Sequence, residues 1–285
     1  MGGPSAENAV SKRSGAAVAD GLRTAGYTVC EIDVRGHAVD LPDDIDLAFI
    51  ALHGEFGEDG AIQKLLSERG VPYTGSDPQA SQASFDKRIS KRIFREAGIP
   101  TPDYEILRAG DRRALPLPVV IKPPCQGSSI GVHKVFTEAK WPAACADAFR
   151  YGEEALVETY IPGRELTVGI VGDEALPVVE IVAPGGWYGY EAKYTPGSTN
   201  YIVPALIADR TAQQCRQVAL RTFRALGCRG LGRVDFRMTE AGQIYVLELN
   251  NIPGFTQTSL LPKAAEAAGI KFHELCDRIA RLATL

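Results

Sequence analysis

The chain has 285 residues, 45% of them hydrophobic and 23% charged, and a formal net charge of −4. This composition is typical of a globular protein and excludes a collagen-like repeat, a coiled coil and a largely disordered chain. The acidic balance gives no general support to nucleic-acid binding, which usually needs a basic surplus. No apolar run approaches the roughly 18 residues of a membrane span, and no signal-peptide pattern opens the sequence. We therefore predict a cytoplasmic protein with reduced thiols and with neither nucleic acid nor membrane as a partner.

The first third of the sequence has an α/β pattern. Helices are predicted at residues 9–25 and 60–68, and short strands at residues 27–34, 47–52 and 71–74. Apolar strands that alternate with helices indicate a parallel sheet. Binding sites in such sheets lie beyond the carboxyl ends of the strands, which lead here into glycine-rich segments such as residues 53–57.

In the middle of the chain, a lysine at the end of a strand precedes a loop rich in glycine and serine. A helix is predicted over residues 84–97, in which Lys87 and Lys91 lie on a stripe different from the apolar one. The strand at residues 119–122 ends in Lys122, and residues 123–131 form the tip of a hairpin. Such a loop can close over phosphate groups, because glycine lets the backbone approach them. The P-loop pattern is missing from the sequence, so a nucleotide site of that kind is excluded.

The second half of the chain is predicted to hold two more hairpins, a long loop and two helices. The first of these hairpins covers residues 165–182, and the long loop covers residues 183–203. A loop of that length inside a compact domain is typical of a functional lid. The helices are predicted at residues 211–226 and 263–283.

The other hairpin, at residues 232–249, carries a cluster of polar side chains. If a four-residue turn joins its strands, Arg233 lies opposite Glu248, and both share one face with Asp235 and Asn250. A register slip of one residue would split this set between two faces. Carboxylate and amide oxygens that converge suit a hard cation, and Mg²⁺ is the usual one beside phosphates. A surface hairpin with a cross-strand Arg–Glu pair is the alternative interpretation.

Motifs along nearly the whole chain carry a resemblance to a known family. In chain order they are Gly2-Gly3-x-Ser5-Ala6-Glu7, His53-Gly54, Pro72-Tyr73-Thr74-Gly75-Ser76, Asp86-Lys87, Lys122-Pro123, Gly127-Ser128-Ser129-x-Gly131, Glu165-x-Thr167-Val168, Tyr190-Glu191-Ala192-Lys193-Tyr194, Gly232-Arg233-x-Asp235, Glu248-x-Asn250, Pro253-Gly254-x-Thr256 and Ser259. A single motif of this kind would be a weak signal, whereas the ordered set is specific. The chain resembles the D-alanine–D-alanine ligases of the ATP-grasp superfamily.

The resemblance implies an α/β fold in which an N-terminal Rossmann-like domain with a parallel sheet precedes two α+β ATP-grasp subdomains that clasp ATP between their sheets. The implied boundaries are residues 1–78, 79–157 and 158–285, the last part with the metal site and the lid loop. In the implied reaction, the carboxylate of one D-alanine attacks the γ-phosphate of ATP and becomes an acyl phosphate. The amine of a second D-alanine then displaces phosphate, which supplies peptidoglycan precursor synthesis. ATP is the implied co-substrate, and Mg²⁺, or Mn²⁺ in its place, is the implied metal.

The resemblance also implies roles for individual residues. The ATP-binding residues would be Lys87, Lys122 and Lys193 at the phosphates, and Glu158 and Glu165 at the adenine and ribose. The metal ligands would be Asp235, Glu248 and Asn250. The catalytic set would comprise Glu7 at the ammonium of the first D-alanine, Ser128 and Tyr194 linking the lid loop to Glu7, Arg233 and the backbone N–H of Gly254 at the oxyanion, and Ser259 at the second carboxylate. His53 would bind substrate beside the first D-alanine.

Further expectations concern specificity and assembly. The intact Lys193-Tyr194 pair predicts an amine, rather than the hydroxyl of D-lactate, as the second nucleophile. A different second substrate and a catalytically weak nucleotide-binding paralogue are the alternatives, and the intact metal-ligand set argues against the paralogue. The resemblance implies a homodimer formed through the first domain. Family members have an apolar strand before the Gly-Gly turn at which this chain begins, so we expect exposed strand edges in the first sheet.

Overall fold

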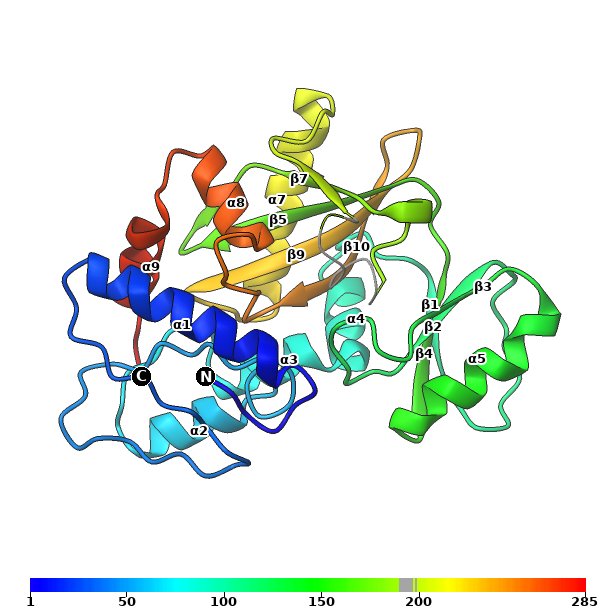
Figure 1. Ribbon diagram of the computed structural model, residues 1–285. Coiled ribbons are helices and arrows are strands. Elements are labelled where there is room, and N and C mark those ends of the chain that lie inside the picture. Colours follow the sequence, from blue (N-terminus) through cyan, green and yellow to red (C-terminus); the bar gives the residue numbers. More distant parts are fainter. Residues whose placement is uncertain (190–196, 198) are drawn as a thin grey trace.

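A computed structural model of the chain describes residues 1–189, 197 and 199–285. In Figure 1 the N-terminal region lies at the lower left, a small sheet with one helix lies at the right, and a larger sheet lies between and above them. Lys193 and Tyr194 fall outside the described residues. No helix among the described residues is both long enough and apolar enough to cross a membrane.

The N-terminal region contains helices α1 (Asn8–Thr24) and α2 (Ala61–Glu68). The strands predicted at residues 27–34 and 47–52 are reduced to isolated parallel bridges, which join Gly2 to Val34 and Ala48 to Tyr73. The direction is parallel, as predicted, but no continuous ladder forms among the described residues. The backbone of Val34 bonds to Met1 and Gly3, at 2.8 and 2.9 Å.

The helix predicted over residues 84–97 is wrong in its extent. The structure has two helices instead, α3 (Pro78–Phe85) and α4 (Lys87–Glu96). Between them Asp86 has an extended backbone, and its side chain accepts a hydrogen bond from the N–H of Arg88. An aspartate in this position caps the start of a helix. The apolar periodicity therefore continues across a break between two helices. Lys87 is consequently the first residue of a helix.

The small sheet has the strand order β1-β4-β2-β3, and all of its pairs are antiparallel. Its strands are β1 (Tyr104–Arg108), β2 (Val119–Lys122), β3 (His133–Val135) and β4 (Glu154–Thr159). Helix α5 (Trp141–Ala148) covers one face, and Ala144 and Ala148 pack there against buried strand residues. The hairpin of β2 and β3 confirms the predicted placement of the glycine- and serine-rich loop at its tip.

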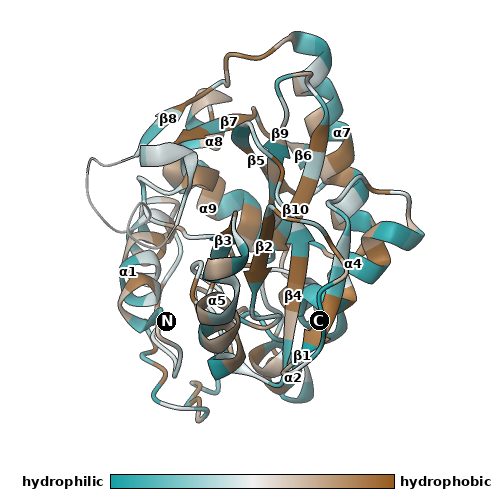
Figure 2. Cartoon of the chain, turned by 90° about the vertical axis from the view of Figure 1, so that its right-hand side faces the viewer, coloured by the Kyte–Doolittle hydropathy of each residue, from teal (hydrophilic) through white to brown (hydrophobic). Residues whose placement is uncertain are grey.

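The large sheet has the order β10-β9-β5-β7-β8, with β6 paired to β5. Its strands are β5 (Arg164–Val171), β6 (Glu174–Ala175), β7 (Val179–Val182), β8 (Asn200–Ile202), β9 (Leu231–Met238) and β10 (Ile244–Asn250). Helix α7 (Asp209–Ala225) packs with α4 on one apolar core. Helices α8 (Leu260–Ala267) and α9 (Phe272–Arg281) share a second core with α1. Figure 2 shows the resulting apolar strands β2, β4 and β10 in the interior.

The register of β9 and β10 differs from the prediction by two successive shifts. Met238 pairs with Ile244, so the loop between the strands is one residue longer than predicted. A bulge between Val246 and Glu248 then adds a second shift, after which Glu248 pairs with Asp235. The predicted pairing of Arg233 with Glu248 is therefore wrong, and Arg233 lies opposite Asn250. Because side chains alternate between faces, two one-residue shifts return the polar groups to one face.

Candidate active site

The polar face of β9 and β10 is organised around the carboxylate of Asp235. Arg233 donates to both of its oxygens, from Nε and Nη2, each at 2.8 Å. Thr167 of β5 and the side-chain amide of Asn250 donate to it at 2.6 and 3.0 Å. Burial alone would lower the pKa of Arg233, but the charge of Asp235 outweighs it and raises that pKa, so the guanidinium stays charged.

One cavity beside this face lies between the two sheets, and we call it the inner cleft. Its charged lining consists of Lys87, Lys122, Glu158, Glu165, Asp235, Arg237 and Glu248. The Nζ of Lys87 lies 3.3 Å from Oε2 of Glu248 and donates to the carbonyl of Gln126 at 2.8 Å. Arg237 lies 3.3 Å from Glu165. The walls also include Val120, Ile161 and Trp187, so the cleft offers both apolar surface and paired charges.

A buried charge cluster lies at the floor of the inner cleft. The carboxylate of Glu158 is 2% exposed and forms ion pairs with Lys122 of β2 and Lys91 of α4. Burial alone would raise the pKa of Glu158, but the two lysines hold it below its ordinary value. Burial lowers the pKa of Lys91 to about 8, although the charge of Glu158 opposes this shift.

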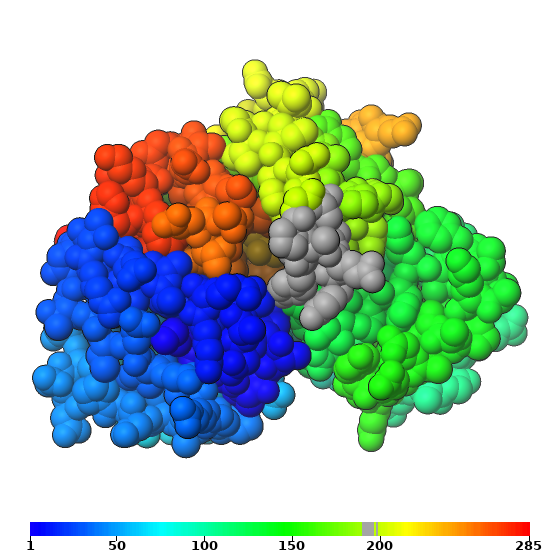
Figure 3. All heavy atoms as spheres, in the orientation of Figure 1, coloured from blue at the N-terminus to red at the C-terminus, as the bar shows by residue number. Residues whose placement is uncertain are grey.

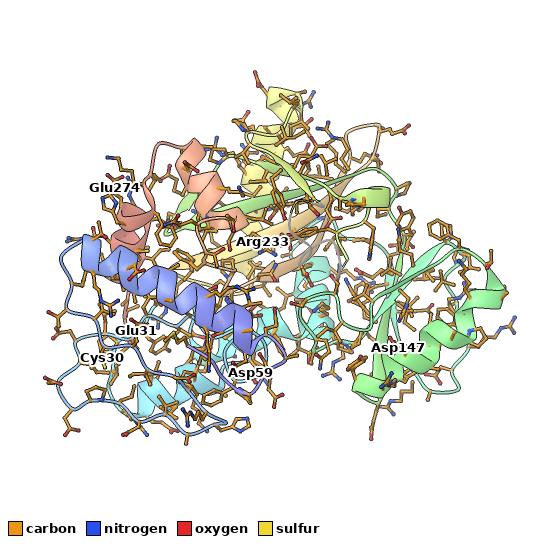
Figure 4. The ribbon with its side chains drawn as sticks, in the orientation of Figure 1. Cys30, Glu31, Asp59, Asp147, Arg233 and Glu274 are labelled. Atoms are coloured by element: carbon orange, nitrogen blue, oxygen red, sulfur yellow. The ribbon has the colours of Figure 1, made fainter. Side chains whose placement is uncertain are left out.

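A second cavity, which we call the outer groove, has a volume of about 850 Å³ and lies on the other side of Arg233 and Asn250. Predicted residues in its lining are Glu7, His53, Ser128, Arg233, Asn250, Gly254 and Ser259. Figure 3 shows a hollow between the N-terminal region and the C-terminal region on this side. In Figure 4 Arg233 lies near the middle of the molecule, between α1 and the large sheet, far from Asp147 on α5.

A contact between two loops closes one side of the outer groove. The hydroxyl of Ser128 donates to Oε1 of Glu7, which lies 121 residues away in the sequence. Ser128 and Ser129 both have positive φ angles, 51° and 59°, which are uncommon for residues with a Cβ. A Cβ on the neighbouring Gly127 would lie 2.8 Å from Oε2 of Glu7, so a larger residue there would require the Glu7 side chain to shift. The loop is thus shaped around Glu7.

His53 connects three segments behind the outer groove. Its Nδ1 lies 3.1 Å from the carbonyl of Ile252, and its Nε2 lies 3.1 Å from the hydroxyl of Ser14. The N–H of Phe255 donates to the same hydroxyl at 3.2 Å. Because a carbonyl can only accept, Nδ1 carries a proton in its contact with Ile252. His53 thereby fixes residues 252–255, including Gly254, against α1.

Ser259 lies immediately before α8 at the far end of the outer groove. Its Oγ accepts from the N–H of Thr256 at 3.0 Å and lies 2.8 Å from the hydroxyl of that residue. This turn aims the N-terminal end of α8 into the groove, where the first backbone N–H groups of a helix attract negative charge.

The structure brings together every described residue of the predicted site. The inner cleft collects the predicted phosphate, nucleoside and carboxylate groups, and the outer groove collects the predicted amino-acid and oxyanion groups. The roles of these residues stay predictions. Sequence reasoning missed Lys91, Arg237 and Tyr188, of which Tyr188 lines both cavities. The signal in the sequence for Lys91 was its spacing of four residues from Lys87, which places both lysines on the same face of one helix.

The donor set on β9 and β10 fits a hard divalent cation. Asp235 and Glu248 supply two carboxylates on paired residues, and Asn250 uses its amide nitrogen toward Asp235, which leaves the amide oxygen for a ligand. Arg233 and Lys87 currently neutralise these carboxylates. No group of three or more His, Cys, Asp or Glu side chains suited to a metal occurs among the described residues.

Comparisons with known proteins agree over the whole chain. The sequence profile of the D-ala D-ala ligase N-terminus matches residues 34–76, and that of the D-ala D-ala ligase C-terminus matches residues 93–281. The chain is 43% identical to a D-alanine–D-alanine ligase of Methylacidiphilum infernorum, with 100% of this chain and 94% of the relative covered. It is 46% identical to one of Desulforudis audaxviator, with 99% and 96% covered.

Solved structures give the same result for the fold. The chain matches a D-alanine–D-alanine ligase from Bacillus anthracis with a TM-score of 0.86 and 34% identity, over 99% of this chain and 95% of the other. A structure from the same organism in complex with ATP matches with a TM-score of 0.84 and 32% identity, over 99% and 94%. The expected fold, an α/β N-terminal region followed by an α+β ATP-grasp part, is confirmed.

Proposed function

The chain belongs to the D-alanine–D-alanine ligase family, and on that premise we propose which of its residues carry out each part of the reaction. The enzyme joins two D-alanines with ATP, through an acyl phosphate, to make D-alanyl-D-alanine for peptidoglycan precursors. It uses ATP and Mg²⁺. Phosphoryl transfer of this kind depends on positioning and on charge neutralisation more than on a protein nucleophile.

The inner cleft is the proposed ATP site. Lys87 and Lys122 neutralise phosphate oxygens. Lys87 exchanges its ion pair with Glu248 for phosphate, whereas Lys122 stays paired with Glu158. Glu158 and Glu165 are proposed to lie at the adenine and ribose, on the resemblance to the family. Asp235, Glu248 and Asn250 hold Mg²⁺, which supplies charge neutralisation at the phosphates when it is bound. Lys193 is proposed as a third phosphate contact on the resemblance alone.

The outer groove is the proposed site of the two D-alanines. Glu7 holds the ammonium of the first D-alanine. The carboxylate of that D-alanine forms a new bond to the γ-phosphorus of ATP, while the bond between this phosphorus and ADP breaks. Ser259, with the N-terminal end of α8, holds the carboxylate of the second D-alanine. The amine of the second D-alanine, after losing a proton, attacks the acyl carbon. Arg233 and the N–H of Gly254 stabilise the oxyanion, and the bond from the acyl carbon to phosphate then breaks.

Two further roles complete the proposed amino-acid site. His53 acts beside the first D-alanine by holding the segment that contains Gly254. Ser128 and Tyr194 are proposed to join Glu7 in linking the loops around the closed site, and the contact of Ser128 with Glu7 supports this part.

A single observation carries the proposal. The polar face of β9 and β10 borders both cavities, with Asp235 and Glu248 in the inner cleft and Arg233 and Asn250 in the outer groove. Groups suited to neutralise phosphate and groups suited to stabilise an oxyanion therefore lie on adjacent positions of one rigid hairpin. A reaction that first forms and then breaks an acyl phosphate needs this arrangement.

The test is a coupled assay of phosphate release from ATP with Mg²⁺ and D-alanine, with mass spectrometry of the product. We expect D-alanine-dependent phosphate and D-alanyl-D-alanine. Glu248→Ala should abolish phosphate release and leave the circular dichroism spectrum unchanged. Residual activity near the wild-type level in this variant would remove Glu248 from the metal site.

The second nucleophile is proposed to be an amine. The support is the intact Lys193-Tyr194 sequence, which lies outside the described residues. An assay with D-alanine and D-lactate together at neutral pH, followed by a panel of D-amino acids, compares the two classes of product. Predominant depsipeptide would contradict the assignment, and a preferred D-amino acid other than D-alanine would establish a different second substrate.

The chain is also proposed to act in the cytoplasm as a homodimer formed through its first domain. The support is its family membership, together with a proposed division into residues 1–78, 79–157 and 158–285. Sedimentation equilibrium should give a mass of twice the 30.6 kDa of one chain. A mass equal to one chain at assay concentrations would contradict the dimer.

A further inference from the structure

Lys91 of α4 is a buried cation to which the proposed reaction gives no role. Its side chain is fully buried, as is that of Phe94 on the same helix. Lysine is rarely buried in this way unless it is paired, because removing an ammonium group from water is costly. An ion pair in a protein interior is often no more stabilising than well-packed apolar residues of the same volume. Stability alone therefore gives no strong reason for a lysine at this position.

The contacts of Lys91 reach two different parts of the molecule. Its Nζ forms an ion pair with Glu158 of β4, in the small sheet. The same Nζ donates to the hydroxyl of Thr101 at 2.6 Å and to the carbonyl of Val246 in the large sheet at 3.2 Å. Thr101 itself donates to that carbonyl at 2.8 Å, and Val246 donates its N–H to the carbonyl of Pro100 at 2.7 Å.

Each of these contacts ends next to a residue of the proposed ATP site. Glu158 also binds Lys122, so the position of its carboxylate determines where the Lys122 ammonium lies. Val246 is the last residue before the bulge that brings Glu248 opposite Asp235. The bulge returns Glu248 to the polar face. Lys91 and Thr101 both donate to the carbonyl of Val246, where the bulge begins. One ammonium group thus lies between the phosphate-binding lysine and the metal-binding glutamate.

We propose that Lys91 is a positioning residue that holds the Glu158–Lys122 pair and the Val246 bulge in a fixed relation, so that Lys122 and Glu248 face the same nucleotide. This inference rests on the assignment of the inner cleft as the ATP site. Groups that orient ligands in this way typically change affinity or activity roughly 10- to 100-fold when they are removed. The link acts before any metal or substrate binds, because all of its contacts exist within the protein.

The test compares Lys91→Met with the wild type in two measurements besides turnover. Isothermal titration with ADP in the presence of EDTA reports on the Lys122 side without metal. The Mg²⁺ concentration for half-maximal activity reports on the Glu248 side. We expect both constants to rise roughly tenfold or more, with the KM of D-alanine unchanged. A folded Lys91→Met protein in which either constant keeps its wild-type value would overturn the proposal, because the link requires both.

Thr101→Val provides a milder variant in case Lys91→Met fails to fold. It removes only the hydroxyl between Lys91 and Val246, and its matched control is Thr222→Val on α7, where a buried hydroxyl donates to the carbonyl of Val218 at 2.8 Å. Thr101→Val should raise the Mg²⁺ concentration needed for half-maximal activity. Thr222→Val should lower the melting temperature but leave that Mg²⁺ concentration unchanged. Equal Mg²⁺ requirements in these two variants and the wild type would overturn the proposal.

The two proposals can fail separately. If the wild-type chain releases no phosphate with D-alanine, the assignment of the ligation site fails. The ADP titrations still decide whether Lys91 orders the inner cleft, because they need no turnover.

Discussion

Two walls of the outer groove are built in different ways. Arg233, on the sheet wall, lies on β9 between β5 and β10, so backbone ladders on both sides fix its position. On the loop wall, Glu7 precedes α1 and Ser128 lies in a glycine-rich tip, and a side-chain hydrogen bond joins them. The difference matches the two demands on the site. On the proposed assignment, oxyanion and metal ligands need fixed geometry, whereas a wall joined by a side-chain hydrogen bond can open for substrates.

The largest effect is expected at Arg233, which lies on a strand paired on both sides. Arg233→Met should lower kcat by about 10²–10³-fold, because an oxyanion donor acts mainly in the transition state. The KM values should change little by comparison. Steady-state kinetics with D-alanine and ATP measure both constants.

Arg164→Met is the matched control for this variant. Arg164 lies on the same sheet and donates from Nε to Glu180 at 2.6 Å, but it lines neither cavity. Its kcat should stay close to that of the wild type. Equal kcat values for Arg233→Met and Arg164→Met would show that the sheet wall contributes no oxyanion donor here.

A smaller effect is expected on the loop wall. Ser128→Ala removes the hydroxyl that binds Glu7 and should lower kcat/KM about tenfold, since hydrogen bonds to charged groups contribute about 1.5–3 kcal/mol. A cycle with Glu7→Gln and the double variant isolates the contact. If the effects of the two single substitutions simply add, the hydrogen bond between Ser128 and Glu7 does not couple the two loops. The loop wall would then not depend on this contact.

The smallest effect concerns the helix behind both walls. Burial alone would raise the pKa of Asp86, but its bonds to the guanidinium and the N–H of Arg88 outweigh burial and lower that pKa below its ordinary value. A lowered folded-state pKa stabilises the protein above the ordinary pKa, and the stabilisation is lost as the pH falls through the folded value. Asp86→Asn should therefore lower the free energy of unfolding by about 1 kcal/mol at neutral pH and by less near about pH 3.

Urea unfolding of the wild type and Asp86→Asn at both pH values measures this difference. An equal difference at the two values would mean that the cap acts without its charge. The measurement shows how firmly the start of α4 is held. This matters because α4 connects the two sheets: Lys87 pairs with Glu248 and Lys91 with Glu158.

The sheet wall was largely predictable from the sequence, but its register was not. Alternation alone placed Arg233 and Asp235 on one face, and the hairpin was confirmed. The buried apolar residues of β10 are Ile244, Val246 and Leu249, whose spacing changes from two to three. That change marks the extra residue of the bulge, but the apolar Leu247 beside it hides the signal.

Other differences came from interactions that single-sequence patterns do not contain. The apolar period of the sequence continues without change through Asp86, but the helix does not. The Asp86 side chain caps the start of α4 by accepting a hydrogen bond from the N–H of Arg88. Lys91 looked like an ordinary polar helix residue, and only the packing of two sheets against α4 reveals its burial. The apolar composition of the N-terminal segments predicted parallel strands. The structure has only isolated parallel bridges there, because ladder formation depends on how the segments pack in the tertiary structure.

The most direct test of the central assignment is anomalous scattering from Mn²⁺ in crystals of the protein grown with ADP. We expect a manganese peak coordinated by Asp235, Glu248 and Asn250 on the polar face of β9 and β10, with the nucleotide phosphates beside it. A bound nucleotide whose manganese lies away from these three side chains would show that the metal site is assigned wrongly.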